Sequence, residues 1–115
     1  MHTTSRFLQG IYPFEGHGLG KPVPIDPALT YTVPPGVTSQ ALYFRGGNST
    51  EEMIAIVLVR DGQPMRYFPI GARAGTHVPL RVVEDLISNN QIELHVAAPE
   101  GCAGTVVVDL GLVEV

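Results

Sequence analysis

The feature that most constrains this chain is an apolar run that is followed at once by a two-residue turn signal. Residues 53–60 read MIAIVLVR, with many β-branched side chains, and Asp61-Gly62 follows directly. An Asp-Gly pair between apolar runs is the strongest short-range signal of a β-hairpin. Residues 63–70 (QPMRYFPI) are therefore predicted to return antiparallel to residues 53–60.

The register of this hairpin predicts a sheet edge. A two-residue loop gives the pairs Arg60–Gln63, Val59–Pro64, Leu58–Met65 and Val57–Arg66. The missing N–H of Pro64 would then point away from the hairpin, which a sheet tolerates only at an edge. The outgoing strand is apolar on both faces, so we expect the core on one face and a buried layer or a subunit contact on the other.

Most of the remaining chain also has the pattern of strands. Residues 91–98 alternate, with Ile92, Leu94 and Val96 facing inward, and residues 105–115 form a final strand with the same alternation. In residues 41–45, Leu42 and Phe44 are expected on one face. Residues 79–88 fit either a strand that runs into a turn or one short helix, and the pattern leaves both open.

The first part of the chain differs, because residues 1–27 are rich in Gly and Pro and have no clear periodicity. We expect an irregular arm over residues 1–27 and strands over residues 28–115, within a single domain of residues 1–115. Short strands separated by turns predict an all-β fold, a single antiparallel β-sandwich or jelly roll with at most one short helix.

Charge is unevenly distributed along the sequence. Five of the six arginines lie between residues 45 and 81, whereas residues 82–115 contain six acidic residues and no basic one. Pairing of these charges across neighbouring strands is the commonest outcome for such a layout. Contact between the basic strip of one subunit and the acidic strip of another is a second reading, and an anion site among the arginines is a third.

Two polar segments, residues 45–50 and 71–77, are the best candidates for a binding site, because turns on a rigid sandwich often carry the binding residues. If they meet at one end of the sandwich, they line a polar pocket suited to a carboxylate or a hydroxyl-rich ligand. The candidate ligand-binding residues, with one from the neighbouring strand, are Arg45, Asn48, Arg66, Arg73, Thr76 and His77. Ordinary turn chemistry explains the same residues and is the simpler reading.

No catalytic or metal motif is recognisable, and we expect no catalytic residue, metal or cofactor. The histidines lack metal-site spacing, and Glu93 with His95 supplies only two neighbouring ligands on one strand. Cys102 has Glu100 beside it, which disfavours a reactive thiolate. GHGLGK is rich in glycine but lacks the ending of a phosphate loop.

The composition of the chain limits the classes of partner that we expect it to bind. The formal net charge of −4 gives no general attraction to nucleic acid or membrane, and the low charged fraction of 16% favours association with another chain. A single cysteine and an N-terminus without a signal-peptide pattern predict a cytoplasmic protein.

We therefore expect a non-enzymatic interaction or assembly module, homo-oligomeric, that offers a small anionic or polar ligand a site at the arginine loops. The alternative is an enzyme, or an accessory subunit of one, that acts on a small acidic substrate held by Arg45, Arg66 or Arg73. Carbohydrate binding is a third option, weakened by the absence of tryptophan.

Overall fold

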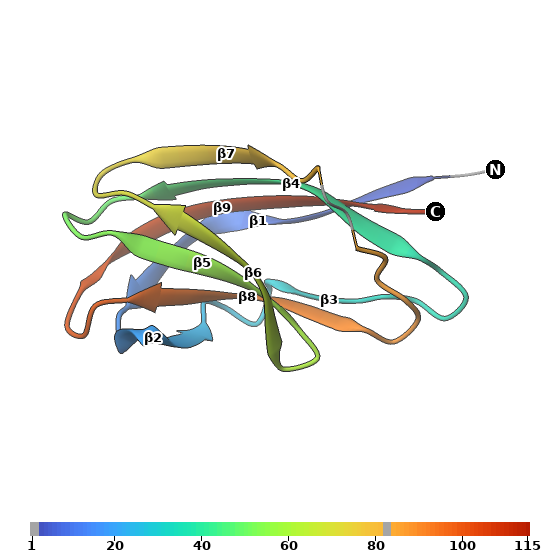
Figure 1. The fold of residues 1–115 in the computed structure, drawn as a ribbon, viewed down its shortest axis with the longest axis horizontal. Coiled ribbons are helices and arrows are strands. Elements are labelled where there is room, and N and C mark those ends of the chain that lie inside the picture. Colours follow the sequence, from blue (N-terminus) through green and yellow to red (C-terminus); the bar gives the residue numbers. More distant parts are fainter. Residues whose placement is uncertain (1–2, 82–83) are drawn as a thin grey trace.

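The computed structural model describes residues 3–81 and 84–115, and its strands form two antiparallel sheets packed face to face (Figure 1). Sheet A contains, in spatial order, β1 (Thr4–Glu15), β9 (Ala103–Glu114), β4 (Ser39–Asn48) and β7 (Gly75–Pro79). Sheet B contains, in spatial order, β2 (Gly18–Pro24), β8 (Gln91–Ala98), β5 (Ile54–Arg60) and β6 (Gln63–Ile70), and β3 (Thr30–Thr32) also pairs with β8. The predicted all-β antiparallel sandwich is confirmed.

The core lies between the two sheets and is built from the inward residues of the alternating strands. Ile92, Leu94 and Val96 are buried as predicted, and so are the inward residues of β9. Phe44 of sheet A stacks on Phe68 of sheet B with their ring centroids 4.4 Å apart. This aromatic pair joins the two layers of the core.

The Asp61-Gly62 turn is confirmed, and the register beyond it differs from the prediction. Both residues have positive φ (50° and 79°), as a type I′ turn requires. The pairs Arg60–Gln63 and Val59–Pro64 form as expected.

The register then shifts, so that Leu58 pairs with Arg66 and Val57 with Tyr67. Met65 is the extra residue of a β-bulge and packs against the core. The prediction failed because a β-bulge adds one residue to a strand, and the alternation of apolar and polar residues in the sequence does not reveal the extra residue.

The irregular arm expected over residues 1–27 is not confirmed, because β1 and β2 occupy most of this segment. β1 pairs with β9 over twelve residues, from Thr4–Glu114 to Glu15–Ala103. Both β1 and β2 lie at sheet edges. The outer side of an edge strand pairs with no other strand, so the missing N–H of a proline that points to that side costs no hydrogen bond of the ladder. The prolines that argued against regular structure are compatible with edge strands.

Prolines mark the edges throughout the sandwich. Four edge strands carry them, namely β1 (Pro13), β2 (Pro22, Pro24), β6 (Pro64, Pro69) and β7 (Pro79). The four inner strands, β4, β5, β8 and β9, contain none. Proline at an edge prevents pairing with a strand of another molecule. The edges are therefore protected, and the expected edge position of β6 is confirmed.

The outward residues of β5 are buried, although residues 3–81 and 84–115 form only two layers. Val57 and Val59 are almost fully inaccessible on the outer face of sheet B, together with Ala97 of β8. Val57 lies in register between Tyr67 on β6 and His95 on β8. The three buried residues form a small apolar cluster with Ala55 on the outer face of sheet B, where we expected another layer or a subunit.

Two further expectations concern residues near Ser39. β4 has a bulge between Ala41 and Tyr43, so Ala41 is buried and Leu42 is exposed, opposite to the predicted alternation. In the described part of residues 79–88, Pro79 ends β7 and Leu86 forms an isolated bridge with Ser39, without a helix. Residues 82 and 83 lie outside the described residues.

No helix in the described part of the chain is long and apolar enough to cross a membrane.

Candidate functional site

The two polar segments expected to form a site do meet at one end of the sandwich. The Asn48 N–H donates to the carbonyl of Ala74 at 3.0 Å, and the Arg73 N–H donates to the carbonyl of Thr50 at 2.8 Å. These are backbone contacts between strand ends and a turn. The side chains of the candidate residues point in different directions and do not converge on one pocket.

Asn48 holds the turn together from a buried position. Its Nδ2 donates to the carbonyls of Glu52 (2.8 Å) and Gly71 (3.1 Å). Its Oδ1 accepts from the backbone N–H (2.9 Å) and the hydroxyl (2.8 Å) of Thr50. Four hydrogen bonds use the full capacity of a buried amide, so Asn48 ties the β4–β5 connection to the end of β6.

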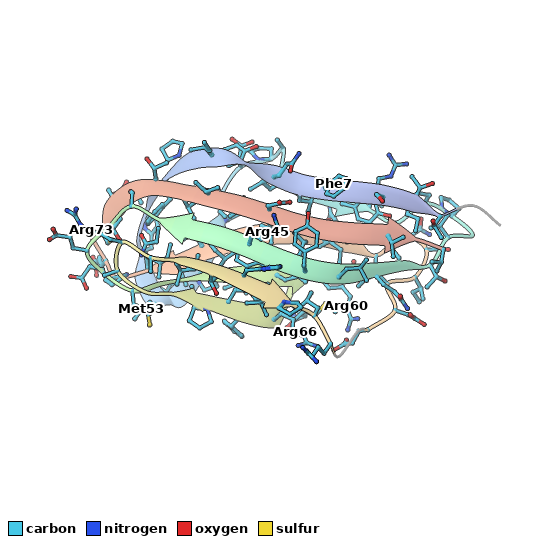
Figure 2. All side chains as sticks on the ribbon, turned by 90° about the horizontal axis from the view of Figure 1, so that it is seen from above. Phe7, Arg45, Met53, Arg60, Arg66 and Arg73 are labelled. Carbon is cyan, nitrogen blue, oxygen red and sulfur yellow. The ribbon has the colours of Figure 1, made fainter. Side chains whose placement is uncertain are left out.

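The other loop candidates also separate. Arg73 lies at the end of the molecule (Figure 2) and forms an exposed ion pair with Glu51 at 2.8 Å. Thr76 has the inward parity of β7, one residue before His77. Arg66 belongs to β6 in the other sheet, near the molecular edge in Figure 2.

Arg45 and His77 are the two candidates that the structure brings together on one surface. They are register partners on β4 and β7, and both are exposed on the outer face of sheet A. Figure 2 shows Arg45 near the centre of this face. The register of β9 and β1 extends the pair into a polar row across all four strands: Gln9, Asp109, Arg45 and His77.

An apolar row lies on either side of this polar row. The first contains, from β1 to β7, Ile11, Val107, Gly47 and Gly75. The second contains, in the same order, Phe7, Gly111, Tyr43 and Pro79. Ile11 is 70% exposed and Phe7 is 52% exposed, so each apolar row presents a large apolar side chain to solvent. We call these three rows together the outer face of sheet A.

Tyr43 is held at the centre of this face. Its hydroxyl donates to Oδ1 of Asp109 at 3.0 Å, and the Arg45 guanidinium lies 5.2 Å from its ring centroid. The His77 ring meets it edge-on at 6.3 Å. Burial, and then the hydrogen bond to the Asp109 carboxylate, raises the pKa of Tyr43. The tyrosine therefore stays protonated and orients Asp109.

The sequence did not indicate Gln9, Ile11, Phe7 or Asp109 as parts of a site. A signal was present, because residues 7, 9, 11 and 13 alternate with inward residues of β1. The glycine and proline content of the N-terminal segment concealed this alternation. Which strand stands beside which is a matter of long-range pairing, so the assembly of the four-residue rows had no local signature.

A second polar cluster lies between the sheets, near the end of the sandwich that carries both termini (Figure 1). The buried Glu114 carboxylate accepts a hydrogen bond from the Tyr31 hydroxyl at 2.6 Å and one from Nε of Arg6 at 3.2 Å. The Tyr31 hydrogen bond, and then Arg6, lowers the pKa of Glu114. Burial, and then the same hydrogen bond, raises the pKa of Tyr31. The cluster links β1 and β9 of sheet A to β3 of sheet B.

Charge pairing across the fold is partly as expected. Arg60 of the basic middle third pairs with Glu84 of the acidic last third at 3.4 Å. Arg73 pairs with Glu51 and Arg6 pairs with Glu114. Neither of these pairs joins the basic middle third to the acidic last third.

The described residues contain no group of three or more His, Cys, Asp or Glu side chains placed to hold a metal ion. Nε2 of His95 lies 3.6 Å from Oε2 of Glu93, beyond hydrogen-bonding distance, and both side chains are only partly exposed. Nε2 of His95 is buried and has no hydrogen-bond partner among the described residues.

Comparison with known proteins identifies the fold. No protein-family model matches the chain, and no curated protein matches it. The chain resembles the CBM36-1 domain of a multidomain xylanase from the hindgut metagenome of Trinervitermes trinervoides, with a TM-score of 0.58 and 16% identity over 96% of both chains. It also resembles a family 35 carbohydrate binding module from Clostridium thermocellum, with a TM-score of 0.51 and 16% identity over 95% of this chain and 97% of that one.

A structure of infectious bursal disease virus, Gx strain, is also similar, with a TM-score of 0.54 and 13% identity. This likeness covers 98% of the present chain but 31% of the viral chain. The fold is that of a jelly-roll-like β-sandwich module. At such identities the resemblance extends to the fold and not to the binding residues.

Proposed function

We propose that this protein is a non-enzymatic binding module whose partner docks on the outer face of sheet A. The observation that carries the proposal is the arrangement of this face, in which a polar row of four side chains lies between two apolar rows. Exposed Phe7 and Ile11 supply apolar contact area, and the polar row supplies directional hydrogen bonds.

The protected edges support a face rather than an edge as the docking surface. Partners that add a strand to a sheet need a free backbone ladder, and prolines interrupt four of the edge strands. The dispersal of Arg45, Arg66 and Arg73 over a sheet face, the other sheet and a turn does not supply the convergent site that the enzymatic alternative requires.

A hydroxyl-rich ligand is the second candidate for this face. A shallow depression of about 400 Å³ between β1 and β9 is lined by Gln9, Gly10, Ile11, Val107, Val108 and Asp109. Its amide and carboxylate suit sugar hydroxyls, and its apolar walls suit the C–H faces of a sugar ring. Two of the similar domains are named as carbohydrate binding modules or belong to a xylanase.

With the single Cys102, we place the module in a reducing, cytoplasmic compartment.

Nuclear magnetic resonance of the ¹⁵N-labelled chain tests the proposal. Amide shifts are recorded while the protein is concentrated, and again while neutral and acidic oligosaccharides are added. We expect concentration or saccharide to shift amides of β1, β9 and β4 that flank the three rows. Shifts confined to residues 71–74, or the absence of shifts on this face with every probe, would contradict the proposal.

One variant on the outer face of sheet A and one matched control in a distant turn make the test specific to this face. Gly47 has ordinary φ, and a β-carbon there would meet Cβ of Val107 at 3.6 Å, a normal contact. Gly47→Leu should therefore fold while it fills part of the surface and removes the shifts. Ala72→Leu, in the exposed turn between β6 and β7, is the matched control and should leave them unchanged.

A further inference from the structure

We propose that the partner on the outer face of sheet A is a second copy of this chain, related by a two-fold axis that runs parallel to the strands between β9 and β4. This inference rests on the proposed function, since it assigns the occupant of the same face. Closed two-fold dimers bury the same patch on both subunits, so the patch must be complementary to itself.

The order of the strands determines what such an axis brings together. When two copies pack face to face, the rotation places β9 of one copy over β4 of the other and β1 over β7, while each row stays at its own level. Every residue of a row then faces the residue at the mirrored position in the same row.

The polar row is complementary in charge. Arg45 of each copy faces Asp109 of the other, and Gln9 faces His77. Two Arg–Asp contacts thus form at the centre of the interface, next to the axis. Tyr43 already fixes the Asp109 carboxylate through its hydroxyl, so the acceptor is held in place before the copies meet.

The first flanking row is complementary in size. Val107 faces Gly47 and Ile11 faces Gly75, so large side chains on one half meet glycines on the other. In the second row, Phe7 faces Pro79, and no hollow is open opposite Tyr43, because its ring already covers Gly111 of its own chain. Packing of knobs into glycine hollows is how closely apposed sheets achieve contact without voids.

The alternative in-plane axis, perpendicular to the strands, gives no such match. It would leave each strand over its own copy, so that Arg45 faces Arg45 and Asp109 faces Asp109 in the polar row. Like charges placed opposite one another oppose association. The charge order of the row therefore selects the axis parallel to the strands.

The size of the face sets the strength that we expect. Four strands at about 4.8 Å spacing and five residues at about 3.4 Å rise, the length of the three rows, give about 330 Å² on each copy. The total of about 650 Å² is below the size of standard specific interfaces and within the range of weak, transient contacts. Packed sheets cross at about 30°, so the two-fold axis is tilted from the strands by half of that angle, about 15°. This tilt preserves the pairing near the centre of the interface and displaces the pairs on β1 and β7. A weak, concentration-dependent dimer follows.

Charge reversal tests this arrangement. Arg45→Asp or Asp109→Arg alone places like charges at both symmetric contacts, and we expect each to weaken self-association at least about a hundredfold. Mixing these two single variants restores opposite charges at both contacts of a heterodimer, and the double variant restores them in a homodimer. Analytical ultracentrifugation over a concentration series measures the wild type, the two single variants, their mixture and the double variant. Native mass spectrometry identifies the mixed dimer, and thermal unfolding confirms that each variant folds.

The outcomes separate the two proposals. Recovery of the dimer in the mixture and in the double variant supports the two-fold arrangement. A wild-type dimer with no recovery in the mixture overturns the arrangement. A wild-type monomer at every concentration, combined with saccharide shifts on the outer face of sheet A, overturns the second copy as partner and leaves the proposed function in place. A monomer without shifts overturns both.

Discussion

The ring of Tyr43 lies over the α-carbon of Gly111, in the space where a side chain at position 111 would be. A β-carbon built on Gly111 would overlap the ring atoms of Tyr43, its register partner on the next strand. The hydroxyl of the same ring donates to Asp109. The absence of a side chain at position 111 therefore determines where Tyr43 lies and how Asp109 is oriented.

Gly111→Ala should displace the Tyr43 ring and destabilise the protein by about 1–3 kcal/mol, the usual cost of an overfilled site. Urea unfolding measures the change. Gly47→Ala on the same face is the control, because its β-carbon makes only ordinary contacts. It should leave stability unchanged or raise it by up to about 1 kcal/mol. Equal losses in the two variants would show that Tyr43 is not the cause.

Gly62→Ala should destabilise the hairpin by about 1 kcal/mol, because residue 62 has a φ of 79° and alanine is strained there. No atom lies within 4 Å of its would-be β-carbon, so the loss would reflect backbone strain alone. Gly20→Ala is the matched control, since it is equally open and has no positive φ. Thermal unfolding of both variants tests the type I′ turn, and an unaffected Gly62→Ala would argue against it.

Asn48→Ala should cost about 3 kcal/mol or more, because it removes a buried side chain that makes four hydrogen bonds and leaves their partners unsatisfied. Asn48→Asp should also be destabilising, since a carboxylate cannot donate to the carbonyls of Glu52 and Gly71. Gln40→Ala removes an exposed hydrogen bond to Asp85 and should cost far less. Chemical denaturation distinguishes them, and a stable Asn48→Ala would reopen a binding role for this residue.

Glu114 should make stability depend on pH in the acid range. Its folded pKa is lowered, chiefly by the Tyr31 hydrogen bond, so the folded state binds the proton less readily than the unfolded state. The stabilisation is present above the unfolded pKa and is lost as the pH falls through the folded pKa. Melting temperatures measured from neutral to acid pH should decline more steeply for the wild type than for Glu114→Gln.

Tyr31→Phe should reduce the same acid dependence, since it removes the main cause of the lowered pKa. Glu51→Gln, at a largely exposed position, provides the control and should follow the wild-type profile. Identical profiles for wild type, Glu114→Gln and Tyr31→Phe would mean that the cluster does not stabilise the ionised carboxylate.

Local patterns were enough to predict much of the fold. The Asp61-Gly62 turn and the alternation of residues 91–98 are properties of neighbouring residues, and both are confirmed. The edge position of β6 followed from one proline without a backbone N–H. The bulges at Leu42 and Met65 escaped prediction because one extra residue depends on how the partner strand fits.

The segment before residue 28 shows where local reasoning fails. Its glycines and prolines exclude helix, and they did not reveal that β1 pairs along β9 over twelve residues. An edge strand receives its hydrogen bonds on one side only, so a composition that suits an irregular segment also suits an edge.

Among the candidate binding residues, Arg45 and His77 share a surface because of one pairing, β4 with β7. Asp109 and Gln9 join them through β9 and β1, which lie at opposite ends of the sequence. The chain's composition and two-residue repeat were sufficient for the class of fold, since they depend on burial and local backbone geometry. The outer face of sheet A required the order of strands in space, because its rows run across strands and their hydrogen bonds join residues that are distant in the sequence.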